Sequence, residues 1–264
     1  MIAVADQAAA DSPAAGALRL NPNLPIPKAV SALDIHLMPG CFHTEYLAED
    51  VAVGAVYAHG TKVLSGALKM GRNPGKGGVA DSIGHYLKLK YPDFNPKRIL
   101  DLGCTIGSNL FPYHDVYPDA ELYGVDVAAP CLRYAHARAV SRNIKAHLFQ
   151  QNAERLSFED NTFDLVVSSF FFHELSVVAT QRVLAECHRV LKPGGMMVQM
   201  ELPATSQVDA FYNFVLDWDN EHNNEPDYRD FRSQNFYALM TGAGFAHGDC
   251  FTVSIPDARE EHFR

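Results

Sequence analysis

The chain has 264 residues, 47% of them hydrophobic, which suits one large domain or a core with a smaller cap. Its formal net charge of −9 argues against a nucleic-acid substrate, because a phosphate backbone requires a basic surface. Five scattered cysteines and the lack of a long apolar run argue against a disulfide framework and a membrane span. The first residues include Asp6 and Asp11 and no basic start, which is not typical of a secretory signal. We therefore expect a cytoplasmic protein.

Residues 1–30 are rich in Ala and Pro and show no periodicity, which predicts a flexible N-terminal arm, or an arm that becomes ordered only by docking on the body. Residues 31–96 are predicted to form a helical cap. Apolar residues at helical spacing indicate one helix before the glycine-rich break at 71–78 and a second helix at 79–90.

Four potential metal ligands lie close together in the cap sequence, namely His36, Cys41, His43 and Glu45. Their spacing matches no standard zinc pattern, so no metal site is predicted. Two alternatives stay open: a buried loop that holds the cap, or His36 or His43 as part of a substrate pocket.

From residue 97 onward strand and helix patterns alternate, which predicts an α/β fold with a doubly wound, mostly parallel sheet. Strands are predicted at 98–102, 121–126, 146–150, 163–170 and 195–201. Helices are predicted at 107–117, 129–142 and 176–191. Nearly continuous apolar strands are expected where helices cover both faces of a sheet. Ligands bind such sheets at the carboxyl ends of the strands.

The part of the chain that follows is predicted to complete this core, which spans 97–264. Residues 203–240 contain many aromatic side chains and are predicted to form a substrate lid. The substrate-binding candidates in this lid are Phe211, Tyr212, Trp218 and Tyr237, with ordinary core packing as the alternative. A further strand is predicted at 246–254. Residues 257–264 are too polar and short for another strand, so an abbreviated sheet and a truncated chain both stay open.

The clearest signal is a strand, a glycine turn, a helix and a second strand that ends on an acid. The turn reads Asp101-Leu-Gly-Cys-Thr-Ile-Gly107, and the acid is Asp126. This order predicts a nucleoside site, in which the ligand approaches the backbone of the turn and the acid binds the ribose hydroxyls. The spacing G-x-x-x-G differs from the G-x-G-x-x-G of dinucleotide sites, which argues against a nicotinamide-dependent oxidoreductase.

This turn resembles the first motif of class I S-adenosylmethionine-dependent methyltransferases, D-x-G-x-G-x-G. Three more segments follow in the family's order, at 123–126, 152–164 and 190–195. The resemblance covers roughly residues 97 to 202 and points to the small-molecule type of ubiquinone and menaquinone biosynthesis. It implies a Rossmann-like methyltransferase fold, S-adenosylmethionine as cofactor, S-adenosylhomocysteine as product and a small-molecule acceptor.

The resemblance also implies roles for individual residues. Gly103 and Gly107 would let the turn pack against the methionine portion of the cofactor. Asp101 would face its ammonium group, and Asp126 would bind the ribose. Thr105 replaces the usual middle glycine, and Asn152 replaces the usual Asp that contacts the adenine. The other cofactor-binding candidates are Cys104, Val127, Ala153, Ser169, Phe170 and Tyr57.

His173, which follows the strand at 163–170, is the candidate catalytic base and a candidate substrate-binding residue; capping of the next helix is the alternative. Methyl transfer from a sulfonium needs mostly positioning, and a base only where the acceptor must lose a proton. We predict methylation of a small, partly hydrophobic molecule in cofactor or specialised-metabolite biosynthesis, with O- or C-methylation favoured and N-methylation open. The alternative is an S-adenosylmethionine-binding protein with other chemistry, such as cyclisation, or a regulatory role. A homodimer is left open.

Overall fold

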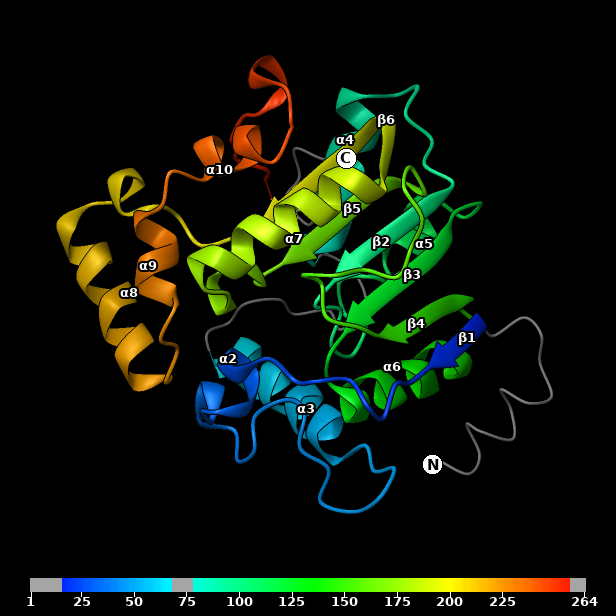
Figure 1. Cartoon of the computed structure of the whole chain (residues 1–264), viewed down its shortest axis with the longest axis vertical. Coiled ribbons are helices and arrows are strands. Elements are labelled where there is room, and N and C mark those ends of the chain that lie inside the picture. Colours follow the sequence, from blue (N-terminus) through cyan, green and yellow to red (C-terminus); the bar gives the residue numbers. More distant parts are fainter. Residues whose placement is uncertain (1–15, 68–77, 257–264) are drawn as a thin grey trace.

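The computed structural model describes residues 16–67 and 78–256, in which a parallel sheet is flanked by helices (Figure 1). Six strands form this sheet in the order β1-β4-β3-β2-β5-β6. They are β1 Gly16–Arg19, β2 Arg98–Leu102, β3 Glu121–Asp126, β4 Ala146–Gln150, β5 Phe163–Ser169 and β6 Leu191–Met200. The chain order reverses between β2 and β5, which makes the carboxyl ends of these strands the expected ligand site.

Helices cover both faces of the sheet. Successive residues of a strand point to opposite faces, so a buried strand packs against helices on each side. Ile99 of β2 packs with residues of α4 (Val79–Lys90) and α6 (Ala129–Ser141). Its neighbour Leu100 packs on the other face with residues of α7 (Val177–Val190). The doubly wound parallel sheet predicted from the apolar runs is therefore confirmed.

Four predicted strands begin at the observed residue, and the fifth, β6, begins four residues earlier than predicted. The predicted helices at 129–142 and 176–191 correspond to α6 and α7. In the predicted cap, α3 (Ala52–Ala67) precedes α4, and its Val53 packs in one cluster with Cys131 of α6. The short helix α2 (Lys28–Ser31) lies before it.

In the N-terminal half, residues 16–19 form β1, which pairs in parallel with β4. Of the two predictions for the arm, this segment fits the one in which it becomes ordered by docking on the body; residues 1–15 lie outside the described part. The backbone N–H of Asn21 donates to Oε1 of Gln150 (3.0 Å) and holds the chain at this edge. The predicted helix at 107–117 is reduced to α5 (Tyr113–Val116), because Gly107 has a left-handed φ of 74° and Pro112 has no N–H to donate.

The predicted strand at 246–254 is also wrong. His247–Asp249 form a 3-10 helix, and residues 250–254 pair with no strand of the described chain. Of the apolar residues in this segment, Ile255 packs against the core while Phe251 and Val253 stay exposed. Residues 257–264 of the predicted core lie outside the described part.

The segment predicted as a lid contains α8 (Ala210–His222), α9 (Tyr228–Ser233) and α10 (Phe236–Gly242). Helices α8 and α9 lie beyond the carboxyl ends of the strands, on the left in Figure 1. Arg232 joins them: its side chain donates to the carbonyl of Pro203 (3.0 Å), to Asp217 (3.3 Å) and to Asn213. Because Arg232 is almost fully buried, these bonds fix α9 on α8 and on the chain after β6.

We expect the substitution Arg232→Met to lower the free energy of unfolding by about 2–4 kcal/mol, because three partly buried acceptors lose a donor that is itself buried. Arg229 offers a matched control, since it contacts the same Asp217 (3.8 Å) from an exposed position. Arg229→Met should cost less than about 0.5 kcal/mol. Denaturant unfolding of both variants measures the difference, and equal losses would show that the buried network does not hold the helices.

None of the helices in residues 16–67 and 78–256 has both the length and the hydrophobicity needed to cross a membrane.

Candidate active site

The glycine turn after β2 lies against the end of β3. Asp126, the last residue of β3, accepts a hydrogen bond from the N–H of Thr105 (2.8 Å) with Oδ2 and from the N–H of Ala128 (2.9 Å) with Oδ1. Gly103 and Gly107 adopt φ angles of 64° and 74°, a left-handed conformation that suits glycine. The glycine turn and the acid at the end of β3 therefore lie side by side.

Thr105 has a φ of 41°, which is unfavourable for a β-branched residue. This conformation explains why glycine is usual at this position of the motif. The bond from its N–H to Asp126 holds the strained residue in place. The same carboxylate therefore shapes the turn and ends β3.

Asp101 presents a buried carboxylate oxygen that needs a partner. Its side chain is almost fully buried, and Oδ2 has no hydrogen-bond partner among the described residues. Burial raises the pKa of Asp101 well above its usual value, and the nearby charge of Asp126 raises it further. Burial also raises the pKa of Asp126, against its backbone hydrogen bonds. Two buried carboxyl groups side by side favour a cationic ligand, so the ammonium group of S-adenosylmethionine fits this turn.

The predicted adenine contacts lie at the neighbouring strand end. Asp126 and Gln150 are paired residues at the ends of β3 and β4, and Asn152 follows directly. The Oδ1 of Asn152 accepts from the N–H of Glu154 (2.9 Å), so this side chain also shapes its own turn. Ala153 is buried, and the carbonyl of Val127 accepts from Nε2 of Gln150 (2.9 Å).

The remaining cofactor candidates are spread around the turn. Cys104 is buried and its N–H donates to the carbonyl of Val125 (3.1 Å). Ser169 ends β5, and its buried hydroxyl has no hydrogen-bond partner in the described part of the chain. Phe170, with a φ of 53°, is half exposed.

Tyr57 of α3 lies between the turn and the acids beyond β5. Burial raises its pKa to about 12; Cys131, Glu174 and Asp126 add to this, and a hydrogen bond with Thr105 acts against it. The phenol is therefore neutral and lies within reach of both groups of charged residues.

His173 is buried just after β5 and is held by an acid that the sequence did not indicate. Its Nδ1 lies 2.8 Å from Oε2 of Glu201, and the other oxygen of Glu201 accepts from two backbone N–H groups that precede His173. Burial lowers the pKa of His173, but the bond to Glu201 and the charges of Glu174 and Glu225 outweigh this and raise it. A catalytic role for His173 stays a prediction.

His36 reaches the same acids from the loop before α3. Its Nε2 lies 3.2 Å from Oε1 of Glu174 and its Nδ1 lies 3.2 Å from Oε1 of Glu225. Burial lowers the pKa of His36, but the two carboxylates raise it to about 10. We call these five residues the His/Glu cluster: His36, His173, Glu174, Glu201 and Glu225.

The other three members of the cap group are not part of this cluster. Glu45 pairs with Arg133 of α6. Cys41 is buried, which raises the pKa of its thiol, and the nearby charge of Glu174 adds to this. Burial lowers the pKa of His43. Of the four potential ligands in the cap sequence, only His36 belongs to a group of possible metal donors with Glu174 and Glu225.

The predicted substrate-binding aromatic residues of α8 are largely exposed to solvent. On α8, Phe211 and Trp218 are 74% and 54% exposed, and Tyr212 is half exposed. Tyr228 and Phe231 of α9 pack against His173 instead, with ring centroids at 5.6 and 6.3 Å. The aromatic segment therefore contacts His173 through Tyr228 and Phe231, which were not among the predicted substrate-binding residues.

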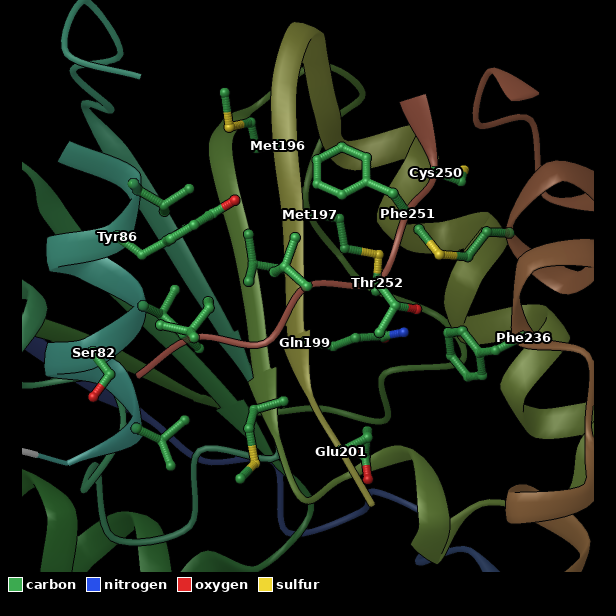
Figure 2. Close-up of a pocket in the computed structure, with 18 of the residues that line it drawn as sticks. Ser82, Tyr86, Met196, Met197, Gln199, Glu201, Phe236, Cys250, Phe251 and Thr252 are labelled. Atoms are coloured by element: carbon green, nitrogen blue, oxygen red, sulfur yellow. The ribbon is translucent and has the colours of Figure 1, made fainter. Parts of the chain in front are cut away.

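A large groove runs along β6 (Figure 2). All the predicted site residues lie in the described part of the chain, and among them only Tyr237 lines this groove. Figure 2 shows Met197 and Gln199 of β6 beside Phe251 and Thr252 of the C-terminal segment. The groove follows from the position of β6 at the sheet edge, where the described chain places no further strand. We place the candidate site at the carboxyl ends of the strands, because the buried charged groups converge there.

Comparison with known proteins finds matches to methyltransferases. Residues 99–195 match the family model of a methyltransferase domain. The demethylmenaquinone methyltransferase of Thermus thermophilus is 36% identical over 108 residues, which cover 41% of this chain and 48% of that protein. That of Geobacillus kaustophilus is 37% identical over 117 residues, covering 44% and 48%. The chain thus spans about half the length of these relatives.

More distant matches include methyltransferases that are named for other acceptors. The tRNA N(3)-methylcytidine methyltransferase Mettl2 of Drosophila melanogaster is 25% identical over 130 residues, covering 43% of this chain and 40% of that protein. Among solved structures, phosphoethanolamine N-methyltransferase 2 of Haemonchus contortus in complex with S-adenosyl-L-methionine has a TM-score of 0.50 at 20% identity, covering 70% of this chain and 41% of that chain. This last likeness shows the fold.

Proposed function

We propose that this chain, whose residues 99–195 form a methyltransferase domain of the S-adenosylmethionine-dependent class, transfers a methyl group from that cofactor to a small, partly hydrophobic molecule. The observation that carries the proposal is the pair of buried acids at the glycine turn. Asp101 has an unpartnered oxygen for a cation, and Asp126 ends β3 where a ribose is expected.

The cofactor, when bound, supplies an activated methyl group on a sulfonium. Asp126 binds the ribose hydroxyls with the lone pairs that its two backbone bonds leave free. Asp101 accepts from the ammonium group, and Asn152 with the backbone of Ala153 contacts the adenine. The chain contributes mainly orientation, which can supply roughly 7–11 kcal/mol of the barrier reduction.

The acceptor would lie between the turn and His173. Tyr228 and Phe231 line this side of His173, and Tyr57 lies between Thr105 and Glu174. Aromatic rings around buried polar groups suit a ring-containing acceptor with an oxygen substituent. The names of the demethylmenaquinone methyltransferases favour the same class of acceptor. Within this proposal, O- or C-methylation is favoured because His173 offers a base. The net charge of −9 supports a small-molecule acceptor rather than RNA, and a cytoplasmic role remains part of this proposal.

A labelled transfer assay tests this function. The protein is incubated with S-adenosylmethionine that carries a deuterated methyl group and with a panel of hydroxylated aromatic and quinol acceptors, and products are analysed by mass spectrometry. We expect S-adenosylhomocysteine and one acceptor that gains the labelled methyl. Acceptor turnover with no transferred label would instead indicate the alternative chemistry that uses the sulfonium without methylation.

A further inference from the structure

We propose that the His/Glu cluster binds one divalent transition-metal ion, with Nε2 of His36, Nε2 of His173, and the carboxylates of Glu174 and Glu225 as ligands. Imidazole nitrogens with carboxylate oxygens form a donor set that suits zinc, iron, cobalt or manganese. No metal site was predicted from the sequence. Of the four potential ligands in the cap sequence, only His36 belongs to this donor set.

Three of the four proposed ligands lie close together. Ligands at about 2.0–2.2 Å from a metal lie about 3–3.5 Å apart at tetrahedral or octahedral angles. Donor atoms of His36, Glu174 and Glu225 all lie within 4.8 Å of one another, a group to which His173 does not belong. The Nε2 of His173 lies 3.9 Å from Oε1 of Glu174 and 3.7 Å from Oε2 of Glu225, so its ring would have to shift to share the ion.

An unpartnered atom points into this cluster. The side chain of Glu225 is 2% exposed, and its Oε2 has no hydrogen-bond partner among the described residues. A buried carboxylate oxygen without a donor is costly, because it has lost its hydration. This oxygen faces Nε2 of His173 at a distance too long for a hydrogen bond, and an ion between them would satisfy both atoms.

The charge around the cluster also favours a cation. Carboxylates outnumber imidazoles by three to two, so negative charge remains even with both imidazoles protonated.

His173 is oriented as a metal ligand usually is. Metal-binding imidazoles commonly donate their second N–H to a carboxylate or carbonyl, which fixes the tautomer and the ring. Nδ1 of His173 faces Glu201, which is not a proposed ligand, at 2.8 Å. Nε2 of His36 lies 3.2 Å from Oε1 of Glu174, and Nε2 of His173 lies 3.9 Å from the same oxygen. Both Nε2 atoms are therefore directed to the same carboxylate, Glu174.

The backbone holds His36 in this position. Its N–H donates to the carbonyl of Asn223 (2.8 Å), and Nδ2 of Asn224 donates to the carbonyl of Asp34 (3.2 Å). These bonds fix the loop before α3 to the chain between α8 and α9, which carries Glu225. The side chain of His36 is 35% exposed, so an ion and an oxygen ligand can reach the cluster from solvent.

The use of the metal in the reaction rests on the proposed function. A bound ion would hold and polarise an oxygen of the acceptor and lower the pKa of a hydroxyl group. Nε2 of His173 cannot bind the ion and accept a proton at the same time. The metal would therefore take over the activation that the sequence analysis assigned to His173 as a base.

The test is calorimetric titration of tag-free, chelator-treated full-length protein with Zn²⁺, Co²⁺, Mn²⁺ and Mg²⁺, without S-adenosylmethionine. We expect one transition-metal ion per chain, bound at least about 100-fold more tightly than Mg²⁺. The thermal midpoint should rise on binding, because the ion joins three segments that are distant in sequence. No transition-metal binding, or no preference over Mg²⁺, would overturn the proposal.

Variants locate the site. Glu225→Gln and His36→Gln should each weaken Zn²⁺ binding by about 10- to 100-fold. His222→Gln changes an exposed histidine at the end of α8 and should leave binding unchanged. If Glu225→Gln does not fold, Glu174→Gln replaces it. Equal binding by the wild type and the cluster variants would assign the ion to surface histidines and overturn the proposal.

The same samples separate this inference from the proposed function. S-adenosylmethionine binding with no metal binding would remove the metal proposal alone. Metal binding that depends on the cluster, in a protein that fails to bind S-adenosylmethionine, would remove the proposed function alone.

Discussion

Replacing Asp101 by asparagine is expected to weaken S-adenosylmethionine binding by about 10- to 150-fold, which corresponds to a lost charged hydrogen bond of about 1.5–3 kcal/mol. The ligand-free variant should at the same time be more stable than the wild type at neutral pH. Asp101 is buried beside Asp126, and both burial and this neighbour raise its pKa. The pKa of Asp101 is higher in the folded than in the unfolded protein. The free energy of unfolding of the wild type therefore falls as the pH rises from the ordinary pKa of an aspartate through the raised pKa of Asp101. Asparagine removes this loss.

Asp164 provides a control of opposite sign. Burial alone raises its pKa, but bonds from Lys192 and from the N–H groups of Lys97 and Arg98 outweigh this and lower it. Its contribution to stability is therefore present above the ordinary pKa and lost as the pH falls through the lowered value. Asp164→Asn should destabilise the protein at neutral pH and leave cofactor binding unchanged. Unfolding curves at several pH values, with cofactor titrations, measure both effects; destabilisation by Asp101→Asn would contradict the role of its buried charge.

Asp126→Ala is expected to produce the second large effect, a loss of cofactor affinity of at least about 1.5–3 kcal/mol. The ribose loses its acceptor, and the N–H groups of Thr105 and Ala128 lose theirs. Thr105 then has nothing to hold its unfavourable φ, so the turn that the cofactor must approach also changes. We expect a lower stability together with the lower affinity, measured by denaturant unfolding and calorimetry.

The control for this variant is Asp164→Ala. Asp164 also accepts two backbone N–H groups, but it lies at the amino end of the sheet. It should therefore reproduce the loss of stability without the loss of affinity. Unchanged cofactor affinity in Asp126→Ala would rule out the ribose role of Asp126.

The sheet could be predicted from sequence because its strands are buried on both faces. Strand β2 shows this, since Ile99, Leu100 and Leu102 are fully buried and read as one apolar run. The glycine turn and Asp126 could be placed as well, because each follows such a strand directly. β1 could not be found in the same way, because a four-residue edge strand is defined by its pairing with β4 and has no pattern of its own.

The His/Glu cluster was only partly visible in the sequence. His173 was indicated by its place after β5, but Glu201 and Glu225 lie 28 and 52 positions further along the chain. Their meeting with His36 depends on how the loop before α3 packs on the segment between α8 and α9, which leaves no local periodicity. A polar residue directly after a predicted strand is the signal that could have indicated Glu201, since it follows β6.

The most direct test of the account is calorimetric titration of the purified protein with S-adenosylmethionine and S-adenosylhomocysteine, with NAD as the control. The paired acids at the glycine turn predict micromolar binding of the first two ligands and no binding of NAD. Binding of NAD in their place, or binding of none of the three, would contradict the claim that this turn is a methyltransferase cofactor site.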